Sequence, residues 1–188
     1  MAPVILKELF EIDDSVPLVG YDSPSGKAFA CKNLGEPQGD LMAMICEPSI
    51  PMRIDQITAL DEFPGVGLVK CIDSGVVNWA SSGRRQPVLI FEKPAGSRVF
   101  ETMESVITPL TDDQIIGGFL TPAVGTLREF SARGLTHRNI RPSNLFYSDE
   151  SARLIMLGEC VSAPPGYNQP LIFESLECVL AVETGRGA

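Results

Sequence analysis

The prevailing spacing of apolar residues in this chain of 188 residues shifts from short runs to a long helical pattern near the connector Pro94–Ser97. Before the connector, apolar residues form short runs separated by Gly, Pro, Asp and Ser, a pattern typical of strands and turns. After it, apolar residues from Ile115 to Phe130 recur at helical spacing. This order predicts an α+β fold with a β-rich domain over residues 1–93 and a helical domain over residues 94–188.

The first domain is expected to contain several short strands and one helix. Residues from Arg53 to Phe63 carry apolar side chains at three-residue steps, which predicts the helix, and Pro64 ends it. The predicted strands are Val4–Leu6, Lys27–Lys32, Val66–Ile72, Val76–Trp79 and Val88–Phe91, with turns at Asp22–Gly26 and Asp73–Gly75.

The second domain is expected to contain a short helix over Val99–Val106 and then a long one. Thr111 and Gln114 have the spacing of a capping box, so the long helix should begin there and continue to about Ala132. Pro122 and Gly125 lie inside this helix and should weaken or kink it. Gly134 is suited to end it.

Composition excludes several function classes. The net charge of −9 argues against a nucleic-acid binder. The five cysteines are widely spaced and form no C-x-x-C pair, which argues against a disulfide framework or a zinc site and favours a cytoplasmic protein. No apolar run approaches the roughly 18 residues that a membrane span needs.

Residues 137–144 read His-Arg-Asn-Ile-Arg-Pro-Ser-Asn and directly follow the predicted long helix. This segment resembles the catalytic loop of protein kinases, H-R-D-L-x-x-x-N. His137, Arg138 and Asn144 match the pattern, whereas Asn139 stands where the kinases have aspartate.

The resemblance extends over nearly the whole chain in a compatible order. Lys32 stands in the place of the ATP-binding lysine, and Ile54–Pro64 in the place of helix αC. Phe91 takes the gatekeeper position, with Glu92 and Lys93 in the hinge that would border a nucleotide. The resemblance therefore implies a two-lobed kinase-like fold, with a β-rich N-lobe and a shortened C-lobe that ends in a remnant of the activation segment around 167–174.

The departures from the kinase pattern bear on activity. Counting from Asn144 places Leu157 where the metal-binding aspartate of D-F-G should stand, and no glycine-rich loop precedes Lys32. An amide cannot accept a proton as a carboxylate does, and a leucine offers Mg²⁺ no ligand. We therefore expect no catalytic residue and no metal site in this degenerate loop, with Asn144 as a remnant that braces it.

These features predict a pseudokinase that serves as a binding or allosteric module, with a protein or a further domain of the same chain as its partner. No cofactor is required in this interpretation, ATP binds weakly at most, and magnesium contributes little. Two alternatives stay open. One is an active atypical kinase that uses Lys32, Asn144 and an unorthodox carboxylate, for which Glu159 and Asp149 are the nearest candidates. The other is a purely structural fragment.

Overall fold

A computed structural model of the chain describes residues 3–35, 39–60, 63, 67–94, 96, 98–100, 109–148 and 154–161. The chain divides into two compact units. Unit 1 comprises residues 1–63, 70–93 and 161–165, and unit 2 comprises residues 64–69, 94–160 and 166–188. None of the described helices is long and apolar enough to cross a membrane.

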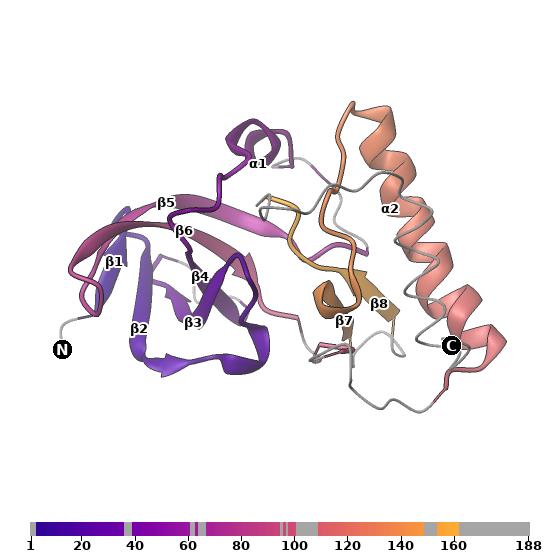
Figure 1. Ribbon diagram of the computed structural model, residues 1–188, viewed down its shortest axis with the longest axis horizontal. Coiled ribbons are helices and arrows are strands. Elements are labelled where there is room, and N and C mark those ends of the chain that lie inside the picture. Colours follow the sequence, from indigo (N-terminus) through magenta and orange to yellow (C-terminus); the bar gives the residue numbers. More distant parts are fainter. Residues whose placement is uncertain are drawn as a thin grey trace. The chain divides into compact units, whose positions relative to one another are not determined.

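Unit 1 is built on a six-stranded antiparallel sheet in the order β1-β2-β3-β4-β6-β5 (Figure 1). The strands are β1 (Val4–Leu6), β2 (Phe10–Pro17), β3 (Gly26–Asn33), β4 (Leu41–Cys46), β5 (Cys71–Trp79) and β6 (Arg84–Glu92). A single turn of 3₁₀ helix, η1 (Val19–Tyr21), lies between β2 and β3, and helix α1 (Ile54–Leu60) lies between β4 and β5.

The sheet curls so that its two edge strands, β1 and β5, contact each other. Leu6 lies against Gly75, where any side chain would come within 2.6 Å of the leucine, and Lys7 pairs with Asp73 at 2.5 Å. The curl encloses an apolar core that includes Phe10, Phe29, Trp79 and Ile90. Curling thus brings the two edges of the sheet close together.

The described part of unit 2 contains a long helical stretch and a β-hairpin. The helical stretch consists of a π-helical part, η2 (Gln114–Leu120), followed by α2 (Thr121–Ala132). A 3₁₀ turn, η3 (Pro142–Asn144), leads into β7 (Leu145–Ser148), which pairs with β8 (Leu154–Leu157). Helix α2 and η2 both contact β8.

The predicted capping box is confirmed, because Thr111 N–H donates to Gln114 Oε1 at 2.9 Å and Gln114 N–H to Thr111 Oγ1 at 3.3 Å. The expected weakening near Pro122 takes the form of the π-helical turns before it, where Thr121 Oγ1 donates to Ile116 O at 2.7 Å. Proline has no N–H to continue the regular bonding pattern. Gly134 ends the helix with φ +69°, as predicted.

Two predictions for the region around the start of β5 are wrong. Asp73–Gly75 is part of β5 and not a turn, because a bulge between Cys71 and Asp73 absorbs the irregularity. The strand predicted over Val66–Ile72 divides, since β5 begins at Cys71 and Gly67–Val69 bond to β8 instead. Strands β2 and β4 were not predicted. The short helix expected over Val99–Val106 and the segment around 167–174 lie mainly or wholly outside the described residues.

Candidate functional site

The loop that follows α2 is positioned by the helix end. Leu135 N–H donates to Phe130 O at 2.8 Å and Gly134 N–H to Ser131 O at 3.1 Å, so the chain reverses sharply after the helix. It then runs to η3 and β7. Arg138 is exposed and adopts a left-handed conformation with φ +59°, while the residues on either side of it, His137 and Asn139, are buried.

His137 is completely buried, and each of its ring nitrogens takes part in a hydrogen bond. Its Nδ1 accepts from the N–H of Asn139 at 3.2 Å, so the ring proton resides on Nε2, which donates to Gly158 O at 3.1 Å. The ring also meets Phe130 edge-on, with 5.9 Å between ring centroids. The histidine thus connects the end of α2, the loop and the segment after β8, which is a structural role.

Asn139 and Glu159 form the centre of the site. The Asn139 Nδ2 donates to Glu159 Oε1 at 2.6 Å and to the Glu159 carbonyl at 3.1 Å. The two residues are 0% and 4% exposed. Asn139 Oδ1 is buried and accepts no hydrogen bond from the part of the chain that the structure describes. The residue at the position of the kinase base therefore acts as a donor to a buried carboxylate.

Asn144 closes the cluster. Its Nδ2 donates to the carbonyls of Asn139 at 2.8 Å and Glu159 at 2.9 Å. Gly158 N–H donates in turn to Asn144 O at 2.7 Å. Residue 158 must be glycine, since a Cβ there would lie 2.0 Å from Asn144 Oδ1. We call His137, Asn139, Asn144 and Glu159 the polar cluster.

Leu157 lies next to the cluster but does not take part in it. It is the last residue of β8, opposite Leu145 on β7, and is 1% exposed. On its other side, its N–H donates to Gly67 O and its carbonyl accepts from Val69 N–H, both at 2.8 Å. The carboxylate that reaches the loop belongs to Glu159, two residues later, because the chain leaves the hairpin only after Leu157.

Lys32 lies on β3 and is exposed, opposite Glu11 of β2. Strand β4 lies between β3 and β6, the strand that carries Phe91. It is β4, and not β3, that directly precedes α1 in the chain. Strand β4 contains no lysine. Among the described residues no ion pair joins Lys32 to Asp55, the acidic residue of α1. The sheet therefore does not place Lys32 beside the predicted hinge strand.

The predicted hinge residues Glu92 and Lys93 are the last residue of β6 and the residue after it. Phe91 is completely buried, and the backbone N–H groups of the next two residues are already used. Glu92 N–H donates to Lys70 O at 3.0 Å and Lys93 N–H to Asp40 O at 2.8 Å, and Pro94 has no N–H. Backbone donors for a base are therefore scarce in this segment.

The chain resembles known proteins in its architecture and not in its sequence. No protein-family model matches the chain, and no curated protein does. A crystal structure of the Mycobacterium tuberculosis PknI kinase domain superimposes with a TM-score of 0.69 and 16% identity, over 98% of this chain and 75% of that one. This chain has a protein-kinase-like fold.

A cysteine-to-alanine variant of the PknI kinase domain gives a TM-score of 0.62 and 17% identity over 85% of this chain. The match spans 62% of that kinase domain. The α+β kinase-like fold expected from the sequence is thereby confirmed. At such identities the likeness concerns the fold alone, so activity has to be argued from the residues of the polar cluster.

Proposed function

We propose that this chain is a catalytically impaired, protein-kinase-like domain that acts as a binding or allosteric module within a larger protein. The observation that carries the proposal is the hydrogen bond from Asn139 Nδ2 to the buried carboxylate of Glu159 at 2.6 Å. A residue in the role of catalytic base has to accept a proton from a bound hydroxyl. Asn139 has its donor group directed at Glu159 and is sealed from solvent.

The donor set does not fit a magnesium ion. Magnesium takes hard oxygen ligands in near-octahedral geometry. Leu157, at the position of the metal-binding aspartate, supplies none. No group of three His, Cys, Asp or Glu side chains suited to a metal ion occurs among the described residues. The proposal therefore assigns no step to a metal ion.

Weak nucleotide binding is part of the same proposal. Lys32 is exposed on β3, and strand β4 lies between β3 and β6. Glu92 and Lys93 already use their backbone N–H groups in hydrogen bonds to the protein. Each of these features takes away a contact that ATP would need. A nucleotide is thus not the natural occupant in this proposal, and a protein or another domain of the same chain is the expected partner.

A second candidate function deserves a test because of Glu159. An active atypical kinase requires a carboxylate near the loop, and the Glu159 carboxylate lies within hydrogen-bonding distance of Asn139. In that case Glu159 would have to turn toward the substrate. Its burial and its bond to Asn139 argue for the impaired domain instead.

Two measurements on the purified chain separate these functions. The first is a thermal-shift titration with ATP, with and without Mg²⁺ or Mn²⁺, on wild type and the Lys32→Ala variant, with Lys27→Ala as a matched control because both lysines are exposed on β3. We expect a small shift that does not depend on metal. A large metal-dependent shift that only Lys32→Ala abolishes would contradict the proposal.

The second measurement is transfer of labelled phosphate from ATP to a generic protein substrate or to the chain itself. We expect none from wild type or from the Glu159→Gln variant. Transfer by wild type that Glu159→Gln abolishes would establish the atypical kinase. A purely structural fragment would give no nucleotide-dependent shift and no association with any other domain of its parent protein.

A further inference from the structure

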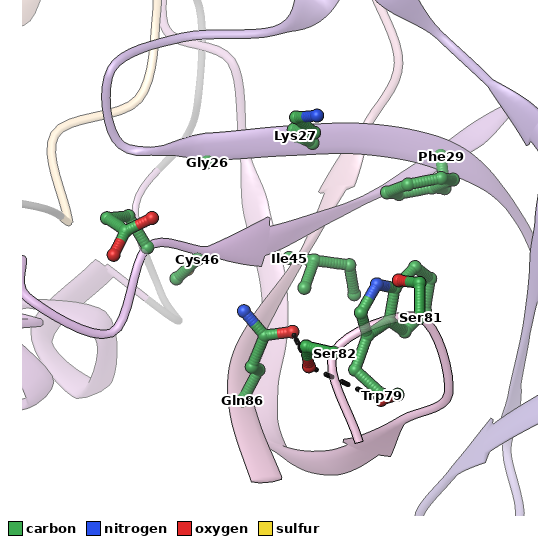
Figure 2. A pocket seen from close by; sticks show the side chains of 10 residues that line it. Gly26, Lys27, Phe29, Ile45, Cys46, Trp79, Ser81, Ser82 and Gln86 are labelled. Atoms are coloured by element: carbon green, nitrogen blue, oxygen red, sulfur yellow. Dashed lines mark hydrogen bonds between the residues drawn. The ribbon is translucent and has the colours of Figure 1, made fainter. Parts of the chain in front are cut away.

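A cavity of about 210 Å³ lies within unit 1, beside the hairpin formed by β5 and β6 (Figure 2). Its lining comes from β3, β4 and that hairpin, and includes Phe29, Ile45, Trp79, Ser82 and Gln86. None of these residues belongs to the polar cluster or to the predicted nucleotide contacts. The kinase resemblance therefore assigns this cavity no role.

Two aromatic rings form one side of the cavity. Phe29 and Trp79 lie with ring centroids 4.8 Å apart and an interplanar angle of 58°. Such a tilted pair gives an apolar surface against which a further flat ring can pack edge-on or offset. Ile45, from the neighbouring strand β4, extends the apolar surface.

Hydrogen-bond donors are available on the same lining. Gln86 Oε1 accepts from Ser82 Oγ at 2.9 Å, which fixes the carboxamide and leaves its NH₂ on the side away from Ser82 (Figure 2). Ser82 Oγ also donates to Trp79 O at 3.3 Å. Ser82 is therefore hydrogen-bonded to both strands of the hairpin. Within the part of the chain that the structure describes, neither the Gln86 NH₂ nor the Trp79 indole N–H donates a hydrogen bond.

The indole donor of Trp79 belongs to the same side chain as part of the aromatic surface. Trp79 is 5% exposed, but its Nε1 is not among the buried polar atoms that lack a partner in the described part of the chain, so this N–H still reaches solvent. It can therefore donate to a molecule that enters the cavity. The Gln86 amide is available to the same molecule.

Charge and size define that molecule further. Lys27 and Glu47 are both exposed and both line the cavity, so the charged side chains of the lining balance. A balanced lining favours a neutral ligand over an anion. The volume suits a compound with one ring, because it is smaller than the 300–1,000 Å³ of sites for drug-sized ligands.

We propose that this cavity binds a small neutral molecule with one planar ring and a carbonyl group. The ring packs against Phe29 and Trp79, and the carbonyl accepts from Gln86 Nε2. This site is independent of the proposed pseudokinase function, since it involves neither ATP nor the polar cluster. Failure of one proposal leaves the other unaffected.

The experiment uses Trp79 as its own reporter, because the chain contains a single tryptophan. The probe is benzamide, titrated into the purified chain with excitation at the red edge of tryptophan absorption. We expect a saturable change in emission with a Kd in the millimolar range, as befits so small a ligand. Toluene, which has the ring without the carbonyl, should bind at least roughly fivefold more weakly.

Variants locate the contact. Gln86→Met removes the donor at similar size and should weaken benzamide binding roughly fivefold to tenfold. Ser82→Ala, which releases the glutamine, should weaken it less. Arg128→Met introduces a methionine at an exposed position of α2, and it should leave the affinity for benzamide unchanged. Thermal unfolding of each variant verifies its fold.

Three results would overturn the proposal. These are no saturable change with wild type, equal affinity for toluene and benzamide, and equal benzamide affinity in wild type and in folded Gln86→Met. If Gln86→Met fails to fold, amide chemical-shift changes on wild type decide the question. Shifts at Gly26, Phe29 and Gln86 support the site, and shifts confined to other residues contradict it.

Discussion

Replacing Asn139 by aspartate restores the kinase motif in sequence, and we expect it to destabilise the protein instead of activating it. The asparagine Nδ2 donates to Glu159 Oε1 at 2.6 Å and to the Glu159 carbonyl at 3.1 Å. An aspartate oxygen in this place has no proton to donate. The variant therefore loses two hydrogen bonds and places a carboxylate against a buried carboxylate.

The magnitude follows from this geometry. Two unit charges at such a distance repel by about 6 kcal/mol at an effective dielectric constant of about 20. The pair avoids the full repulsion by binding one proton, which raises the pKa of one carboxyl group. Holding that proton at pH 7 costs about 1.4 kcal/mol for each pH unit above its ordinary pKa near 4, or about 4 kcal/mol. We expect a loss of about 3–5 kcal/mol in the free energy of unfolding near neutral pH.

The sign of the pH dependence is fixed by the same proton. The folded variant binds one proton more than the unfolded chain between the ordinary and the raised carboxyl pKa, so its stability falls as pH rises through that window. The deficit relative to wild type should shrink to about 1–2 kcal/mol at pH 5. Urea unfolding followed by far-UV circular dichroism at pH 5 and pH 8 measures both values.

Matched variants test the reasoning. Asn78→Asp makes the same change at an exposed position on β5 and should alter stability by no more than about 0.5 kcal/mol. The double variant Asn139→Asp/Glu159→Gln exchanges the carboxylate and the carboxamide, and it should recover a large part of the loss. An Asn139→Asp protein as stable as wild type at pH 8, or a double variant no better than the single one, would refute the geometry.

Three further perturbations follow from other contacts. Gly158→Ala should lower the free energy of unfolding by about 1–3 kcal/mol, since its Cβ would lie 2.0 Å from Asn144 Oδ1. Gly125→Ala on α2, where a Cβ has nothing within 4 Å, should raise it by about 0.5–1 kcal/mol. Thermal unfolding of both variants compares the two effects. Leu157→Asp restores the metal-binding residue in sequence but buries a carboxylate between β7 and residues 67–69. The variant should therefore unfold at a lower urea concentration than wild type. It should show no gain in Mg²⁺-dependent ATP binding. Burial raises the pKa of the Cys31 thiol to about 11 from a usual 9.0, so the stability of the protein should decline as pH rises between these values. Cys31→Ala should reduce this decline. Urea unfolding midpoints measured across the same pH range test the expectation.

Sequence reasoning succeeded where the local signal and the tertiary structure agree. The capping box at Thr111, the stop at Gly134 and the strands around Lys27–Lys32 and Val88–Phe91 depend on neighbours in the chain. Strand β4 escaped prediction because Leu41–Cys46 is buried throughout and shows no alternation. Asp73–Gly75 has the composition of a turn, yet the curl of the sheet holds it in β5 against Leu6.

The candidate site shows the same division. His137, Asn139 and Asn144 were identified from the motif, and the structure brings all three together. Glu159 was only a remote candidate, because counting along the chain from Asn144 pointed to Leu157. The count could not show that β8 continues through Leu157 and that the chain turns toward the loop after it. Spacing identifies a position in a strand but not where that strand ends.

The polar cluster also explains why single repairs of the motif are unpromising. A catalytic base works at a surface that substrate can reach. Here the side chains of the cluster bond to one another and to the backbone of Gly158 and Glu159, all sealed from solvent. Such a network holds the loop, the end of α2 and the segment after β8 in one arrangement. Under the proposed function we therefore expect that activity requires a new arrangement of this segment and not one restored carboxylate.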